Sequence, residues 1–327
     1  MAEQKKTICV TGGAGFIGSH LVDAFLRRGH RVLVIDDLST GREGNLASAA
    51  EFHPLDVVSP EAAKVVEDSG ADLLVHQAAQ MNVRRSVTDV LHDGRTNVLG
   101  GLNMFEAARR GGVPQILFAS TGGAIYGDQE VFPAPEEHPL RPLSPYGVSK
   151  LASESYLYYY HQTYGMDVTC LRYANVYGPR QNPHGEAGVI AIFLQLLLAG
   201  QIPTIYGDGL QTRDYVHIDD VVAANLAAAN LGLTKLELNS EPGYRIYNVG
   251  TGVETSVVDL YRLIAESLGS SVEPRHGAAK AGEQLRSSVD PRRALRELDL
   301  PEPRSLASGL PETVQWFAGQ AADVPAT

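Results

Sequence analysis

The sequence has little cysteine and little positive charge for its length of 327 residues. It contains two cysteines, Cys9 and Cys170, and 27 lysines and arginines against 38 aspartates and glutamates, so the formal net charge is −11 at pH 7. Each cysteine lies in a short apolar run typical of a buried strand, so we expect free thiols rather than a disulfide or a catalytic thiol. The excess negative charge repels a phosphate backbone, and we expect no nucleic-acid partner.

Long apolar segments are also missing. No apolar run reaches the roughly 20 residues that a helix needs to cross a bilayer. The first strand-like pattern meets Gly12 and Gly13 too early for a signal peptide. We therefore expect a cytoplasmic protein that does not enter a membrane. The rest of the composition, 44% hydrophobic and 20% charged, is that of a globular chain, and the length suggests two domains.

The first half of the sequence alternates short apolar runs with helical patterns. The runs predict strands at 7–10, 31–35, 71–75, 115–119 and 168–173. The intervening patterns predict helices at 18–28, 95–110 and 145–164. Continuous apolar strands separated by helices of this length favour an α/β fold with a doubly wound parallel sheet, covered by helices on both faces.

The sequence changes character after residue 175. Glycine, proline, asparagine and histidine crowd residues 178–188, and helical patterns follow at 189–199, 219–231 and 253–268. We predict a first domain over residues 1–175 and a smaller C-terminal substrate-binding domain formed mainly by 176–320. We expect segments within about 214–250 to return to the first domain, and the tail 321–327 to fray.

A glycine-rich motif, TGGAGFIG at residues 11–18, follows the first strand and opens the first helix. Gly12, Gly15 and Gly18 allow a tight turn and a close approach of the backbone to a pyrophosphate, which faces the free N–H groups of the helix. Asp36 ends the second strand, where its carboxylate can bind ribose hydroxyls and repel a 2′-phosphate. The motif predicts a Rossmann-type domain that binds NAD rather than NADP.

A second motif, Tyr-x-x-x-Lys, places Tyr146 and Lys150 on one face at the start of a predicted helix. An unperturbed tyrosine has a pKa near 10, and a neighbouring ammonium together with the positive nicotinamide is expected to lower it. Upstream, Ser120 and Thr121 follow the strand at 115–119, at the sheet edge where ligands bind in such folds. Either hydroxyl can hydrogen-bond the oxygen that Tyr146 deprotonates.

In this order the motifs resemble the extended short-chain dehydrogenase/reductase superfamily, and within it the nucleotide-sugar 4-epimerases of the UDP-glucose 4-epimerase type. The resemblance extends from about residue 6 to about residue 317. Besides the two motifs above, it includes the segments His76–Ala79, Asn97–Gly100, Arg172–Asn175, Tyr177–Arg180 and Gln211–His217.

The resemblance implies an isomerase that acts at C4 of a UDP-sugar through a 4-keto intermediate, with NAD used and regenerated in each cycle. Tyr146, Lys150 and Thr121 would be catalytic, with Ser120 as the alternative to Thr121. No metal is expected. The cofactor-binding residues that it implies are Gly12, Gly15, Phe16, Ile17, Gly18, Asp36, Asp37, Asp56, Val57, Gln77, Ala78, Ala79, Asn97, Tyr146, Lys150 and Tyr173.

The residues after Thr121 discriminate between reactions of the superfamily. Its sugar 4,6-dehydratases have Asp-Glu there, and its UDP-glucuronate decarboxylases have a Glu, because elimination of water needs a further acid and base. Gly122 and Gly123 occupy these positions here and cannot transfer protons. The pattern therefore favours epimerisation over elimination.

The resemblance also implies substrate-binding residues, in addition to Thr121 and Tyr146. Asn175 would contact the sugar and phosphates, Arg213 and Lys280 the diphosphate, and Val189 and Tyr206 the uracil. Ordinary packing is the alternative role for Tyr206, and an ion pair with a neighbouring aspartate is the alternative for Arg213.

Ser287 occupies the position that in the family limits the size of the sugar's C2 substituent. A small residue there admits N-acetyl groups, so we expect UDP-GlcNAc and UDP-GalNAc as additional substrates. The alternative is a surface serine without such a role.

Other functions remain open. Arg84 and Arg85 could bind the carboxylate of the substrate in a UDP-glucuronate 4-epimerase, although a solvated position at the surface is the favoured alternative for them. A nucleotide-sugar dehydratase or reductase of the same superfamily is a further alternative. A non-enzymatic NAD sensor is disfavoured by the intact Tyr-x-x-x-Lys motif.

The family pairs its helices corresponding to 95–110 and 145–164 into an intermolecular four-helix bundle, so we expect a homodimer. Ring packing within one subunit is the alternative role for the many tyrosines of 145–164.

Overall fold

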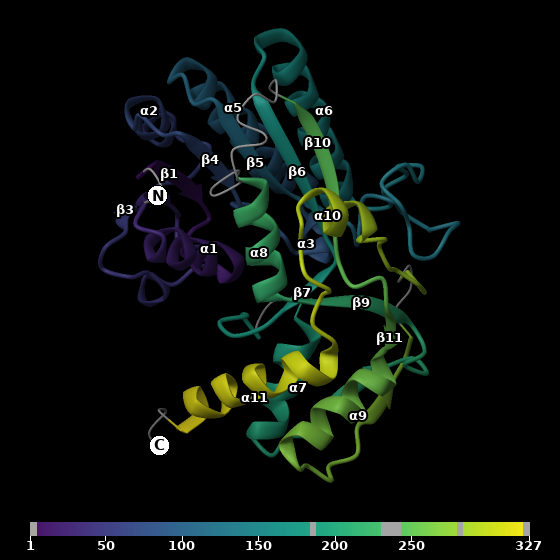
Figure 1. Ribbon diagram of the computed structural model, residues 1–327. Coiled ribbons are helices and arrows are strands. Elements are labelled where there is room, and N and C mark those ends of the chain that lie inside the picture. The colour runs from purple at the N-terminus through teal and green to yellow at the C-terminus, as the bar shows by residue number, and fades with distance from the viewer. Residues whose placement is uncertain (1–4, 184–187, 230–242, 280–283, 323–327) are drawn as a thin grey trace.

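The computed structural model describes residues 5–183, 188–229, 243–279 and 284–322 (Figure 1). Within these residues a large α/β body carries a smaller, mainly helical body beneath the carboxyl ends of its strands. The larger body contains both predicted motifs.

The larger body is built on a seven-stranded parallel sheet with the strand order β10-β6-β5-β4-β1-β2-β3. The order reverses between β1 and β4, and the loops at their carboxyl ends diverge and leave a crevice. The doubly wound sheet predicted from the sequence is confirmed. Its strands are β1 (Thr7–Thr11), β2 (Arg31–Ile35), β3 (Glu51–His53), β4 (Leu73–His76), β5 (Gln115–Thr121), β6 (Asp167–Tyr173) and β10 (Tyr244–Val249).

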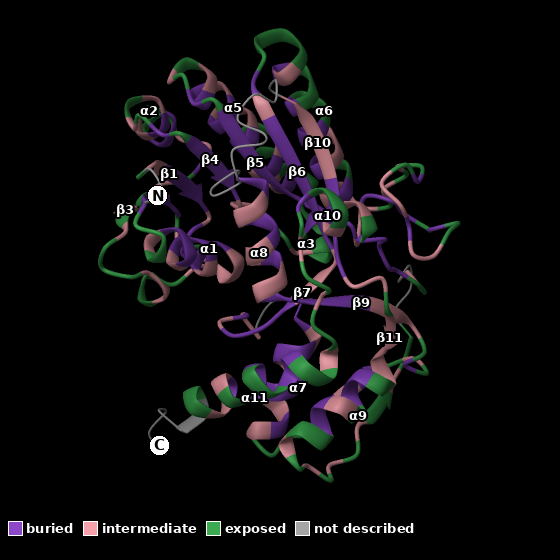
Figure 2. Ribbon diagram, in the orientation of Figure 1, coloured by how far each residue is buried: buried purple, intermediate pink, exposed green. Residues whose placement is uncertain are grey.

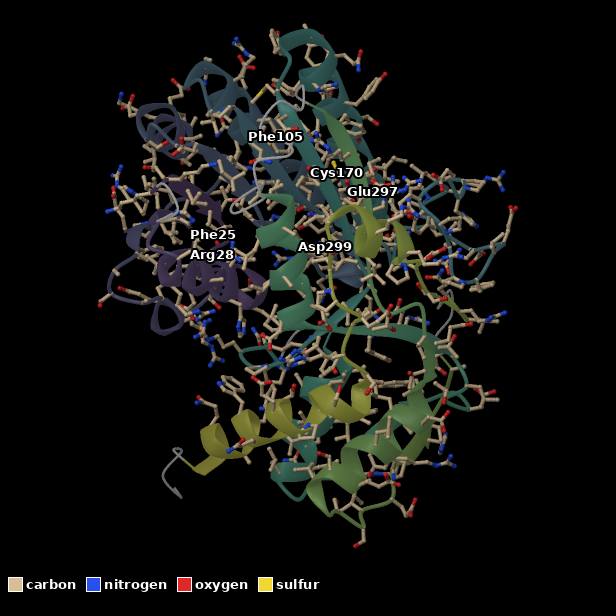
Figure 3. The ribbon with its side chains drawn as sticks, in the orientation of Figure 1. Phe25, Arg28, Phe105, Cys170, Glu297 and Asp299 are labelled. Carbon is tan, nitrogen blue, oxygen red and sulfur yellow. The ribbon has the colours of Figure 1, made fainter. Side chains whose placement is uncertain are left out.

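Helices cover both faces of this sheet (Figure 1). On one face lie α1 (Phe16–Arg27) and α8 (Ile218–Ala228), and on the other lie α2 (Pro60–Asp68), α5 (Gly100–Arg110) and α6 (Pro145–Tyr164). Each face of the sheet has its own apolar cluster beneath its helices. Phe25 on α1 is fully buried in one cluster and Phe105 on α5 in the other; both residues are labelled in Figure 3. Because both faces are covered, the central strands are buried along almost their whole length (Figure 2).

The ends of α6 follow from its sequence. The Ser144 side chain accepts a hydrogen bond from the Gly147 N–H at 3.2 Å, and Pro145, which has no N–H to satisfy, occupies the first turn. Gly165 ends the helix in the left-handed conformation, with φ +67°. The prediction of 145–164 is therefore confirmed to the residue.

Two predicted helices are interrupted in the structure. The pattern at 95–110 splits into a π-helical stretch, η2 (Gly94–Leu99), followed by α5. The pattern at 253–268 begins with a short strand, β11 (Glu254–Ser256), because Ser256 caps α9 (Val257–Leu268) by accepting from the Asp259 N–H. Between β2 and β4, where the sequence patterns predict no element, the structure also contains β3 and α2, which are too short or too polar to stand out in the sequence.

The smaller body packs three helices, α7 (Val189–Leu198), α9 and α11 (Leu306–Ala322), around their own apolar cluster. Above them, β7 (Asn175–Tyr177), β9 (Thr212–His217) and β11 form a three-stranded sheet. The remaining elements are β8 (Thr204–Tyr206), β12 (Arg275–Gly277), α3 (Val83–Thr88), α4 (Val90–Asp93), α10 (Arg292–Glu297) and the short η1 (Glu43–Asn45).

Two expectations drawn from what the sequence lacks can be compared with the structure. Cys9 and Cys170 are both buried and free, as predicted. Among the described residues, no helix is both long and apolar enough to span a bilayer.

A buried ion pair joins α6 to the sheet. Arg172 on β6 donates to both carboxylate oxygens of Glu154, at 2.9 and 2.6 Å, and both side chains are almost fully buried. Ser120 on β5 donates to the same carboxylate at 2.6 Å. Because these charges are removed from water, each depends on the other for its stabilisation.

Arg172→Met should therefore lower the free energy of unfolding by about 3–5 kcal/mol, because Glu154 is left as an unpaired buried charge. Denaturant titration followed by circular dichroism measures this change. The double variant Arg172→Met/Glu154→Leu should recover much of the loss, since no unpaired charge remains. A single variant as stable as the parent would contradict this account of the pair.

Candidate functional site

A cavity of about 900 Å³ opens at the carboxyl ends of the strands, between the two bodies. It brings together nearly all residues that the sequence predicted for the site. The predicted residues that line it are Gly12, Gly15, Phe16, Ile17, Gly18, Asp36, Asp37, Asp56, Val57, Gln77, Ala78, Ala79, Thr121, Tyr146, Lys150, Tyr173, Asn175, Val189, Tyr206 and Arg213.

The glycine-rich loop between β1 and α1 is packed so closely that side chains would not fit. A Cβ on Gly12, whose φ is +70°, would lie 2.6 Å from the Ala78 backbone nitrogen, and one on Gly18 would lie 2.1 Å from the Gly12 carbonyl oxygen. The loop therefore presents its backbone to the cavity, ahead of a 12-residue helix. This cradle suits a pyrophosphate, which the N–H groups and the positive end of the α1 dipole would stabilise.

Asp36 closes the cavity at the end of β2. Its carboxylate accepts hydrogen bonds from the backbone N–H groups of Ala14 and Leu38, both at 2.9 Å. These bonds hold the side chain in place, while burial raises the pKa of Asp36. A carboxylate in this position suits ribose hydroxyls and disfavours a 2′-phosphate, as NAD requires.

Asn97 does not line the cavity, although the sequence placed it among the cofactor-binding residues. It is buried, and its amide exchanges two hydrogen bonds with the backbone of Gln80, at 2.8 and 2.9 Å. Asn97 thus supports the wall formed by Gln77, Ala78 and Ala79 from behind. In front of this wall, the Gln77 amide donates to the Tyr173 hydroxyl at 3.1 Å.

Tyr146 and Lys150 project from the first turns of α6 into the cavity. The Tyr146 phenol is hydrogen-bonded to the Thr121 hydroxyl. The Lys150 ammonium donates to the Ala119 carbonyl at 2.7 Å and lies 5.9 Å from the centre of the Tyr146 ring. Since the Ser120 hydroxyl instead donates to Glu154, Thr121 rather than Ser120 is the partner of the phenol.

The pKa of Tyr146 shifts opposite to the sequence-based expectation. Burial raises it to about 12, against the lowering effect of the Thr121 hydrogen bond, and the charge of Asp93 raises it further. Burial also lowers the pKa of Lys150 to about 8. The sequence gives no measure of how completely the protein excludes water from the pair, and the expected lowering includes the charge of the nicotinamide, so it stays a prediction for the protein with bound cofactor.

The predicted substrate-side residues enter the cavity from the smaller body and its linkers. Asn175 begins β7, Val189 begins α7, Tyr206 ends β8 and Arg213 lies on β9. Arg213 donates to the Thr212 carbonyl at 2.7 Å. Lys280 lies outside the described residues.

Ser287 is buried, which excludes the surface position considered for it, but it does not line the cavity. Its neighbour Gln284 does, and donates to the Gly127 carbonyl at 2.6 Å. Gln284 and the likewise unpredicted Gln181 lie in irregular segments without a motif, so no sequence signal identified them.

Comparison with known proteins places this geometry in a family. Residues 8–250 match the model of the NAD dependent epimerase/dehydratase family. The chain belongs to this family. Membership confirms the superfamily and the cofactor, NAD, that were expected from the sequence. The expected enzyme class, an isomerase, is confirmed by the UDP-glucose 4-epimerases among its relatives.

Individual relatives span nearly the whole chain. A UDP-glucose 4-epimerase of Mycolicibacterium smegmatis is 43% identical over 313 residues, covering 94% of this chain and 97% of its own. The crystal structure of UDP-glucose 4-epimerase from Thermotoga maritima, with UDP-glucose, matches with a TM-score of 0.90 at 41% identity, covering 96% and 99%. The crystal structure of the UDP-glucose 4-epimerase from Thermus thermophilus, a complex with NAD, matches with a TM-score of 0.87 at 40% identity, again covering 96% of this chain and 99% of its own.

Gly18→Ala should weaken NAD binding about tenfold or more, because its Cβ would displace the Gly12 carbonyl and the loop that faces the pyrophosphate. Calorimetric titration with NAD measures the change. Gly44→Ala is the matched control, since a Cβ there meets no atom within 4 Å. Equal affinities for Gly18→Ala and the parent would show that the loop does not form the pyrophosphate site.

Proposed function

We propose that the protein interconverts UDP-glucose and UDP-galactose by epimerisation at C4 through a 4-keto intermediate. One observation carries this proposal: a buried phenol, hydrogen-bonded to a threonine hydroxyl, faces the same cavity as a glycine-rich dinucleotide cradle. Its similarity to the UDP-glucose 4-epimerases of Mycolicibacterium smegmatis and Thermotoga maritima supports the choice of sugar.

The residues of this chain divide the chemistry between them. Thr121 orients the C4 hydroxyl, and Tyr146 takes the proton from that oxygen and later returns it. Lys150 places a positive charge beside the phenol, which favours its ionised form. When bound, NAD supplies the acceptor and donor for the hydride at C4.

Both faces of the sugar must reach the same reacting position, so the nucleotide has to stay bound while the sugar turns. Asn175 would contact the sugar and phosphates, Arg213 the diphosphate, and Val189 and Tyr206 the base. All four line the cavity from the smaller body and its linkers, whereas the glycine-rich loop lines it from the larger body. A planar guanidinium binds a diphosphate through paired hydrogen bonds. Anchoring of the nucleotide there leaves the sugar free to rotate.

The cavity lining argues against elimination of water. Among the described residues, the only carboxylates that line it are Asp36, Asp37 and Asp56, which belong to the adenosine side beyond β2 and β3. A Cβ on Gly122 would lie 2.6 Å from the Val289 side chain, so this position has no room for an acid. Epimerisation needs no group beyond Tyr146 and Thr121, whereas dehydration does.

Two extensions of the substrate range follow from other residues. The small and buried Ser287 favours acceptance of UDP-GlcNAc and UDP-GalNAc, although it does not line the cavity itself. Arg84 lines the cavity, which supports UDP-glucuronate as a second candidate substrate because a guanidinium pairs well with a carboxylate.

Incubation of the protein with UDP-galactose, without a reductant, should yield UDP-glucose, resolved by anion-exchange chromatography. Parallel incubations with UDP-GalNAc and UDP-glucuronate measure the substrate range. Tyr146→Phe should lose at least 10²-fold in kcat and still bind NAD, because only the proton transfer is removed. No C4 epimer from any of the three sugars would refute the proposal.

The same assay tests Ser287. Ser287→Tyr should slow turnover of UDP-GalNAc much more than that of UDP-galactose, because the larger side chain would narrow the space for the N-acetyl group. Equal slowing of both sugars would remove Ser287 from substrate selection.

We further propose a homodimer through the helices at 95–110 and 145–164. Leu99 on η2 and Val148 and Tyr156 on α6 are large apolar or aromatic side chains that remain exposed. By contrast Tyr160 is buried against the sheet and packs on Phe105. Since η2 packs beside α6, these exposed apolar side chains lie on neighbouring helices, which favours an interface there.

Analytical ultracentrifugation at micromolar concentration should therefore show a dimer. Tyr156→Arg should shift it towards monomer, since a charge at an interface centre is desolvated without a partner. Val131→Arg, at an exposed residue outside both helices, should leave it a dimer. A monomeric parent protein would contradict this interface.

A further inference from the structure

A fully buried carboxylate lies behind the reacting tyrosine without being part of the cavity. Asp93, the last residue of α4, has no exposed surface. It accepts hydrogen bonds from the Ser149 hydroxyl at 2.6 Å, the Gln80 amide at 3.0 Å and the Asn97 amide at 2.9 Å. All three donors are neutral, so these bonds satisfy the oxygens of Asp93 without neutralising its charge.

Each donor belongs to an element that shapes the site. Ser149 immediately precedes Lys150 on the inner face of α6. Gln80 follows the cavity wall at residues 77–79, and Asn97 fixes the backbone of Gln80 from η2. Asp93 therefore connects the helix that carries Tyr146 to the wall that faces the cofactor.

The buried charges around this point balance in two pairs. Glu154 is paired with Arg172, which donates twice to its carboxylate. The two remaining buried charges are the Lys150 ammonium, which donates to a neutral carbonyl, and the Asp93 carboxylate. An unpaired buried charge is costly, and each of these two makes the other tolerable.

Other titratable groups nearby contribute little to this balance. His76 on β4 is buried, and burial lowers its pKa to about 3, so it is neutral. The charged side chains on adjoining surfaces are at least partly exposed, where water screens them: Arg84 and Arg85 on α3, Asp89 and His92 on α4, and Arg95 on η2.

We propose that Asp93 is a positioning residue for the Tyr146–Lys150 pair, and that its buried negative charge keeps Lys150 as an ammonium and Tyr146 as a phenol until substrate and cofactor are bound. It acts through Ser149 and through space, since it does not line the cavity. For Tyr146 the assignment rests on the proposed epimerase function, whereas the effect on Lys150 does not.

The direction of the effect follows from charge. The charge of Asp93 raises the pKa of both Lys150 and Tyr146. Its removal should make both groups lose their protons at lower pH. For the epimerase, both limbs of the pH profile of kcat/KM should move towards acid by about one pH unit.

The test compares Asp93→Asn with Ser149→Ala, which removes the shortest hydrogen bond to Asp93 but leaves every charge in place. Lys150 is titrated without substrate, by acetylation with acetic anhydride at a series of pH values and mass spectrometry of its peptide. In the parent and in Ser149→Ala, half-maximal reactivity should fall near pH 8, and in Asp93→Asn about one unit lower. The pH profiles of kcat/KM for UDP-galactose are measured in parallel.

An unshifted Lys150 in Asp93→Asn overturns the proposal whether or not the protein epimerises any sugar. If Lys150 shifts between the parent and Asp93→Asn but the parent epimerises no sugar, the proposed function is contradicted and the role of Asp93 towards Lys150 is not. Asp93→Ser, smaller and also neutral, provides a second variant. If neither neutral variant folds, the carboxylate serves folding and the proposal is wrong.

Discussion

The reversal of strand order between β1 and β4 is the constraint on which the site depends. The chain leaves β1 for α1 on one face of the sheet and leaves β4 for helices on the other face. The loops that begin these two connections pack closely: a side chain at Gly12 would meet the Ala78 backbone, and one at Gly18 would meet the Gly12 carbonyl. The same edge of the sheet receives Thr121 from the end of β5 and Tyr146 from the start of α6. Dinucleotide cradle and hydroxyl pair therefore share one cavity because of the sheet topology alone.

Burial determines the protonation states of Tyr146 and Lys150. Removing the pair from water raises the pKa of Tyr146 and lowers that of Lys150, so without bound ligands the phenol stays protonated although Lys150 lies beside it. The buried carboxylate of Asp93 raises the pKa of both groups, although it does not line the cavity. The tyrosine is thus held in a resting state that bound ligands would change, which suits a reaction that must take and return one proton.

Much of the fold and of the site was predictable because local chemistry determined it. Ser144 caps the N-terminus of α6 and Gly165 ends the helix, and apolar runs identified the central strands. Other features depend on tertiary contacts that leave no local pattern. The π-helical stretch forms where Asn97 binds the backbone of Gln80, and the burial of Ser287 and of Tyr146 depends on segments distant in sequence.

If Tyr146 and Thr121 handle only the proton on the C4 oxygen, the hydrogen on C4 itself must return to the same sugar. Turnover of UDP-galactose labelled with deuterium at C4 tests it directly, with the product examined by nuclear magnetic resonance. The product should be UDP-glucose that retains deuterium at C4 and takes up none from solvent at any carbon. Loss of the label to solvent, or a 6-deoxy-4-keto product, would contradict it.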